Sequence, residues 1–326
     1  MMKKAKPILV LLIKILVSLG LLAFFFSRIH IERFFNTFAS ANFAYIGLAM
    51  AVYFASQFLG AIRWKVLARP LGFNVSLKLY FVFYLIGMFF NLFAPGTVGG
   101  DVSRIYYLAR EGDAGREKRW GGATMNSAVV VFIDRVIGMM VLIWVGAMGL
   151  LLFPQYRVPH AVRLLTFGLA AAFIAGGLLL PILRRLLPAG SHPILVKLRV
   201  AVSAYNSDWR AVPQAIGLSF VIHFLQAWIH LMLAAALAID LPFSYCTIIY
   251  PLVGTFSALP VSLNGLGLRE GGYLYFLGLI GINSEKGIAF GLLLFLVVAA
   301  DSLIGGLVFL ARKSPAPAAV AVNSEG

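Results

Sequence analysis

Two arginines follow prolines at the same distance in two distant parts of the chain. Arg104 lies nine residues after Pro95, and Arg269 lies nine residues after Pro260. A guanidinium group carries forked N–H donors that match the oxygens of a phosphate or carboxylate. Proline interrupts a helix, and the start of the next helix presents unpaired N–H groups and positive polarity, which bind anions. The two breaks therefore predict a site for an anion.

The residues around both breaks repeat this pattern at a separation of 165 positions, with a hydroxyl residue at +2 and a glycine at +5 from each proline. Hydroxyl, carboxylate and amide side chains suit helix N-caps, so Thr97 and Asp101, or Ser262 and Asn264, are expected to cap the returning helices. Glycine permits the tight turn before each of them. The candidate binding residues are Thr97, Gly99, Gly100, Asp101, Arg104, Ser262, Asn264, Gly265, Gly267, Arg269 and Glu270. The alternative is structural: Arg104 pairs with Asp101, and the glycines serve close helix packing.

Charged residues also stand within apolar runs, at Asp134, Arg135 and Asp301. Charges at membrane depth are costly, so these side chains either carry protons or act as fixed counter-ions, and both alternatives stay open. Adjacent residues on a helix point apart, so Asp134 and Arg135 need different partners. His223 and His230 share a helix face without further ligands, so we predict no metal, no cofactor and no catalytic residue.

Composition defines the class of protein. Of 326 residues, 61% are hydrophobic and 12% are charged, which excludes an ordinary water-soluble domain. Apolar runs long enough to cross a bilayer as helices occupy 8–27, 43–62, 124–152, 163–183, 214–239 and 287–310. The prediction is an all-α integral membrane protein with six spanning helices. Arg63-Trp64-Lys65, directly after the run 43–62, is expected to anchor that helix at the membrane surface.

The basic residues predict an orientation. With the N-terminus in the cytoplasm, the proposed inner segments hold 18 Lys and Arg residues and the outer ones hold five, so both termini are expected to be cytoplasmic. This count requires 79–110 to enter and leave on the inner side and 243–281 to do so on the outer side. Both segments are therefore expected to form re-entrant helical hairpins.

Three correspondences at nearly constant offset indicate a duplication. The two proline motifs are 165 residues apart, "DRVIG" (134–138) and "DSLIG" (301–305) are 167 apart, and Gln57 and Gln226 are 169 apart. The predicted units are 1–152 with hairpin 79–110, 153–313 with hairpin 243–281, and a disordered tail at 314–326. An odd number of crossings in each unit gives an inverted-topology repeat, in which paired Gly/Pro breaks mark a transport site.

The net charge of +15 has two readings, a nucleic-acid partner or a membrane surface. Because the basic residues gather on one side of the predicted bilayer, we expect anionic lipids at the cytoplasmic face as partners and no nucleic acid. The sequence contains no GxxxxGK[ST] loop, so nucleotide-driven pumping by this chain is not expected.

The segments "PGTVGGDVSR", "FIDRVIG" and "PVSLNGLGLREGG" resemble the transmembrane flippase-like domain family of lysylphosphatidylglycerol synthases, over about residues 8 to 310. The resemblance implies a translocase for a membrane lipid in the bacterial inner (plasma) membrane. It places Gly100, Asp101, Arg104, Asn264, Gly267, Arg269 and Glu270 along the lipid path. No soluble aminoacyl-transfer domain accompanies these segments, so synthesis of a lysyl lipid is not expected.

The expected function is therefore flippase-like movement of a phosphate-bearing or otherwise polar lipid between leaflets, without enzymatic activity. One alternative is a membrane-embedded transferase acting on a lipid headgroup, with Glu270 or Asp101 as the base. Another is a non-catalytic scaffold for a lipid or glycan synthesis enzyme.

Overall fold

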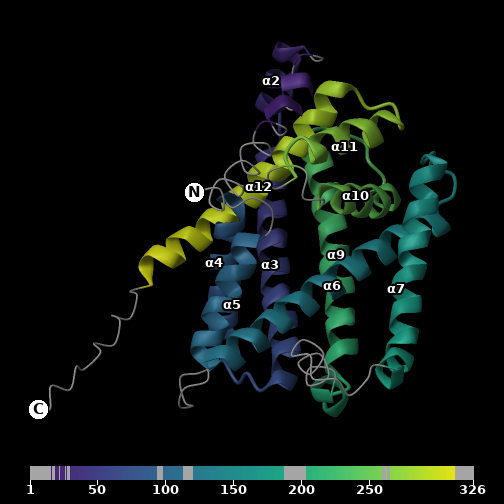
Figure 1. Cartoon of the computed structure of the whole chain (residues 1–326). Coiled ribbons are helices and arrows are strands. Elements are labelled where there is room, and N and C mark those ends of the chain that lie inside the picture. Colours follow the sequence, from purple (N-terminus) through teal and green to yellow (C-terminus); the bar gives the residue numbers. More distant parts are fainter. Residues whose placement is uncertain are drawn as a thin grey trace, which may run out of the picture.

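The structure is a computed structural model of the whole chain (Figure 1). The residues that it describes are 16, 19–21, 23–25, 27, 30–93, 98–112, 120–186, 203–258, 262 and 265–312. Within these residues the regular elements are all helical, as predicted. Thr97, Asn264, both motif prolines and the 314–326 tail lie outside the described residues.

Five helices are long and apolar enough to cross a membrane. Each coincides with a predicted span, and their lengths of 26 to 33 residues exceed what a hydrocarbon core of about 30 Å requires. They are α3 (Phe43–Ala68), α6 (Trp120–Leu152), α7 (His160–Leu186), α9 (Ala211–Ala236) and α12 (Ser284–Ala311). The sixth predicted span, 8–27, lies mostly outside the described residues.

Large apolar side chains point outward from these helices. Phe132 is 68% exposed, Leu178 72% and Leu310 78%. Such broad apolar exposure is typical of a surface that faces lipid rather than water.

The first predicted hairpin is a pair of short antiparallel helices, α4 (Leu77–Phe93) and α5 (Val98–Gly112), which lie side by side in Figure 1. Phe83 stacks on Tyr107 with ring centroids 5.1 Å apart, and Gly100 lies against the backbone of Gly87. At 17 and 15 residues, the helices are about 26 and 22 Å long, shorter than a full span.

The second predicted hairpin is also a pair of short helices, α10 (Phe243–Ser257) and α11 (Leu268–Gly278). The Tyr245 hydroxyl donates to the Phe276 carbonyl at 2.6 Å, which joins the start of α10 to the end of α11. The turn before α11 has positive φ at Gly265 (76°) and Gly267 (83°), a conformation that favours glycine.

Equivalent helices of the two predicted repeats run in opposite directions, as an inverted repeat requires. Along the α3 and α9 pair, the Asn42 amide donates to the Ala236 carbonyl at 2.9 Å, and Gln226 donates to Ser56 at 3.1 Å. Arg63 then reaches Ser219 at 2.9 Å near the other ends. Figure 1 likewise shows α6 and α12 running in opposite directions along the height of the molecule.

The remaining elements connect these helices. α2 (Ile31–Ala39) lies at the end of the molecule where α3 begins, and the 3₁₀ helix η1 (Arg69–Leu71) follows α3 at the opposite end. The backbones of α12 and α4 are in close contact at Gly305. A Cβ atom at this position would overlap the Leu85 carbonyl oxygen.

We expect Gly305→Ala to destabilise the protein by about 1–3 kcal/mol, since overpacking forces the α12 and α4 backbones apart. The melting temperature in detergent measures this effect. Gly217→Ala in α9 is the matched control, because no atom lies within 4 Å of its added Cβ. Equal melting temperatures for the two variants would show that α12 and α4 are not in this contact.

Candidate functional site

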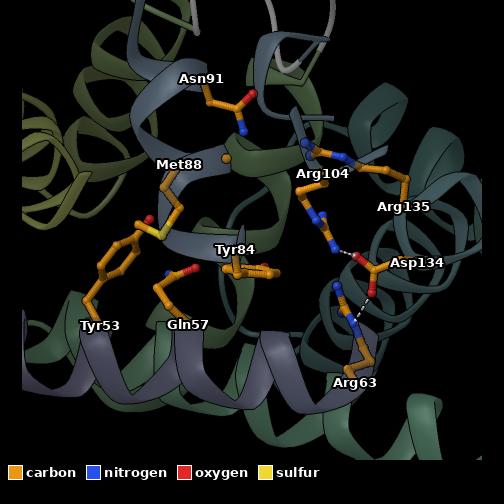
Figure 2. A pocket seen from close by; sticks show the side chains of 10 residues that line it. Tyr53, Gln57, Arg63, Tyr84, Met88, Asn91, Arg104, Asp134 and Arg135 are labelled. Atoms are coloured by element: carbon orange, nitrogen blue, oxygen red, sulfur yellow. Dashed lines mark hydrogen bonds and ion pairs between the residues drawn. The ribbon is translucent and has the colours of Figure 1, made fainter. Parts of the chain in front are cut away.

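The polar centre of the molecule is built around Asp134 on α6. Its Oδ1 accepts from Arg63 Nε of α3 at 2.8 Å, and its Oδ2 accepts from Arg104 of α5 at 2.9 Å. All three residues are buried. One carboxylate therefore holds two guanidinium groups from two other helices, as Figure 2 shows.

Glycines and aromatic rings make room for these arginines. Gly87 faces the stem of Arg104, and Gly138, four residues after Asp134, faces the Arg63 guanidinium. The Arg104 guanidinium carbon lies 4.3 Å from the centre of the Trp64 ring and 4.7 Å from that of Tyr84. Cation–π contacts of this kind help to stabilise a desolvated charge.

A second ion pair lies beside the first. Arg135 makes a bidentate pair with Asp101 of α5, with nitrogen to oxygen distances of 2.9 to 3.1 Å. Asp101 also lies 4.0 Å from Arg104, so the predicted Asp101–Arg104 pair exists only at the limit of contact distance. The first-turn Gly100 amide donates to the Asn91 side chain at 2.8 Å.

A polar cavity of about 200 Å³ opens between these groups. Its lining residues come from four helices: Tyr53, Gln57, Arg63, Tyr84, Gly87, Met88, Asn91, Arg104, Asp134 and Arg135. Figure 2 shows the ionic network on one side and Tyr53, Gln57 and Met88 on the other.

The charges around the cavity do not balance. Within this ionic network, counted over the described residues, three arginines at positions 63, 104 and 135 face two aspartates at 101 and 134, which leaves the network with one net positive charge. The Nε of Arg104 is buried and has no hydrogen-bond partner in the described structure. An unpaired buried donor on a cation is costly.

The ionic cluster of the second repeat has no net charge, because its arginine pairs with a glutamate. Arg269 donates to Glu270 Oε1 at 2.9 and 3.1 Å and lies 5.2 Å from the Phe295 ring. Glu270 is fully buried and accepts the Gly267 amide at 2.6 Å, so it caps α11. This helix begins at Leu268 with Gly267 as its N-cap, so the expectation of Ser262 or Asn264 in that role was wrong.

The other predicted residues divide between these clusters. Gly99 and Gly100 lie in the first turn of α5 with Asp101, and Gly265 packs on Ser257 beside the second cluster. Ser262 is buried, and its hydroxyl has no partner in the described part of the chain. Arg269 does not line the cavity, but its charge acts on Tyr53, which does.

Asp301 differs from the other buried acids. It is 2% exposed, its Oδ2 has no hydrogen-bond partner, and no ion pair joins it to another described residue. The counter-ion alternative thus describes the geometry of Asp134 and Arg135, whereas proton transfer stays a prediction for Asp301.

Several lining residues were not predicted from the sequence. Arg63 and Trp64 suggested an anchor at the membrane surface, but both are buried, because α3 continues six residues beyond the predicted end at 62. The signal for Arg63 was a charge on the same helix as Gln57, directly after the apolar run 43–62. Tyr53, Tyr84 and Asn91 gave no signal of their own.

The histidines of α9 serve structure. His223 contacts the Tyr250 hydroxyl at 2.7 Å and the Gly138 carbonyl at 2.9 Å, and His230 contacts the Tyr273 hydroxyl at 2.5 Å. No group of three potential metal ligands occurs among the described residues.

Outside the spanning helices, burial raises the pKa of Tyr205, whose neutral hydroxyl donates to the Leu67 carbonyl at 2.6 Å.

Comparison with known proteins agrees with this architecture. Residues 11–305 match the family described as the lysylphosphatidylglycerol synthase TM region. The chain belongs to this family. It is a multi-pass membrane protein, and the matched region is the transmembrane region of the synthases.

A more distant relative is a UPF0104 membrane protein of Methanocaldococcus jannaschii, 28% identical over 109 residues. The aligned part covers 33% of this chain and 31% of that protein, so the chain matches about a third of the relative's length.

We expect Asp134→Asn to lower stability by about 3–5 kcal/mol, because it leaves two buried guanidinium groups facing each other. The matched control is Asp301→Asn, which removes a buried carboxylate without breaking a described ion pair. Thermal unfolding of the purified variants in detergent measures the difference. A loss for Asp301→Asn as large as that for Asp134→Asn would contradict the proposed importance of the double pair.

Proposed function

We propose that this protein is a lipid translocase that moves a phosphate-bearing lipid between the leaflets of a bacterial inner membrane, with both termini in the cytoplasm. The observation that carries the proposal is the polar cavity whose ionic network has one excess positive charge. Ionisable groups within a membrane protein mark substrate pathways when they face an interior cavity, as Arg104 does.

The cavity has the chemistry of a headgroup site. The Arg104 Nε lacks a partner, and the Asn91 oxygen is occupied by Gly100, which leaves its amide nitrogen as a donor. Figure 2 shows that nitrogen directed toward the cavity. Charge-assisted bonds from the Arg104 guanidinium, together with a bond from the Asn91 amide, to phosphate oxygens would neutralise the excess charge.

The arrangement of the helices supplies a means of movement. The short pairs α4–α5 and α10–α11 are the proposed re-entrant hairpins, one in each half of the chain. The two halves contact each other through the antiparallel helices α3 and α9. Rocking of one half against the other about this pair would expose the cavity to one leaflet at a time.

The transferase alternative gains no support from the geometry. Its proposed bases, Glu270 and Asp101, are held by Arg269 and Arg135. A general base must reach the proton that it removes, and paired carboxylates are poorly suited to this role. The scaffold alternative is tested by the same variants as the translocase.

We expect Arg104→Gln to slow the movement of a phosphate-bearing lipid by about 10- to 100-fold, because hydrogen bonds to a charged group are worth about 1.5–3 kcal/mol. The measurement is leaflet exchange of fluorescently labelled phosphatidic acid in vesicles that contain the purified protein. Any product of headgroup transfer is detected by chromatography of the extracted lipid.

The matched control is Arg69→Gln, which removes an exposed arginine paired with Asp208 at the end of the molecule. It should exchange lipid at the wild-type rate. Equal rates for wild type and Arg104→Gln, with both proteins folded, would leave a scaffold as the better description. A new lipid product would favour the transferase.

A further inference from the structure

A large apolar groove lies beside the polar cavity. It is bounded by α2, the first half of α3 and the middle of α12, and its volume is about 620 Å³, three times that of the cavity. Its lining includes Phe38, Phe43, Ile46, Met50 and Leu296. No charged residue is among the lining residues.

One face of α3 lines both the groove and the cavity. Phe43, Ile46 and Met50 line the groove, and Tyr53 and Gln57 line the cavity. The alternating spacing of three and four residues places all five on one side of the helix. Met50 and Tyr53 are separated by a rise of only about 4.5 Å, so the apolar hollow is followed directly by the polar one.

The polarity of α12 changes at the same level. Val297 and Ala300 line the groove, and the next residue, Asp301, is buried and acts electrostatically on Tyr53. Both helices thus place polar side chains at the end of the apolar groove. A hollow with this division fits a molecule that has a hydrocarbon part and a charged part joined end to end.

We propose that the groove and the cavity form one amphipathic binding site, in which a hydrocarbon chain of the lipid lies between α2, α3 and α12 while its phosphate lies beside Arg104. This inference rests on the proposed function and adds the position of the chain. The occupant is a lipid chain rather than a protein segment because the groove residues of α3 are followed, one turn on, by residues of a cavity whose excess positive charge matches a phosphate.

The site also orients its lipid. Because α3 begins at the groove and passes the cavity further along, the chain points toward the end of the molecule that carries α2. The headgroup lies toward the middle of α3. A free phosphate would use the cavity alone, whereas a lipid would use both hollows.

Photo-crosslinking of the full chain in a detergent without phosphate tests this inference. The two probes are a phosphatidic acid with a diazirine at the end of one acyl chain and a diacylglycerol with the same labelled chain. We expect phosphatidic acid to label segments 35–50 and 293–300 at least about tenfold more than diacylglycerol does, because only its phosphate forms the charge-assisted bonds.

Variants that fill the groove provide the control. Ile46→Trp and, from the other wall, Ala300→Leu should remove the excess labelling, whereas Leu48→Trp on the exposed opposite face of α3 should retain it. Size-exclusion chromatography confirms that each variant is folded. Equal labelling by both probes, or labelling unchanged by both groove variants, would show that the groove holds bulk chains and overturn the inference.

Binding of glycerol 3-phosphate separates this inference from the proposed function. If glycerol 3-phosphate binds to the wild type but not to Arg104→Gln, and the groove shows no preferential labelling, the headgroup site stands and the chain site is wrong. If neither glycerol 3-phosphate nor phosphatidic acid binds, both proposals are wrong.

Discussion

The structure depends on a single carboxylate shared by two arginines. Asp134 holds Arg63 and Arg104, and through them it ties α3 and α5 to α6 at the polar centre. A buried pair of this kind gains little over apolar packing, but it is expensive to break. Sharing one anion between two cations also leaves a positive charge at the cavity. The same interaction therefore organises the fold and supplies the excess charge to which we attribute the proposed anion binding.

The two repeats use related motifs for different purposes. Arg269 pairs with Glu270, which also caps α11, so the second cluster is neutral. Arg104 shares the Asp134 carboxylate with Arg63, and its Nε has no hydrogen-bond partner in the described structure. Among the described residues, the cation available to a ligand thus lies in the first repeat, and the second contributes Asp301 and α12 beside the apolar groove.

Composition and the length of apolar runs predicted six spanning helices, five of which are present among the described residues, and both broken segments, because long apolar runs and Gly/Pro interruptions are local signals. Arg104, Asp134 and Arg135 could be predicted as a set for the same reason, as charges among apolar residues. Their pairing could not, since it depends on how α3, α5 and α6 meet. Arg63 was missed because a basic residue near a helix end normally lies at the membrane surface, and Tyr53 and Asn91 because their types are common in any helix.

The excess charge itself can be tested by adding one carboxylate to the cavity. Gln57 lines the cavity, and Gln57→Glu supplies the missing anion, while Gln57→Met keeps the size and leaves the charge unchanged. The measurement is binding of glycerol 3-phosphate to each purified variant, together with its melting temperature. We expect Gln57→Glu to bind at least about tenfold more weakly than Gln57→Met and to melt at a higher temperature, because opposite charges at low dielectric attract strongly. Equal binding by the two variants would contradict the claim that the unbalanced arginine holds the phosphate.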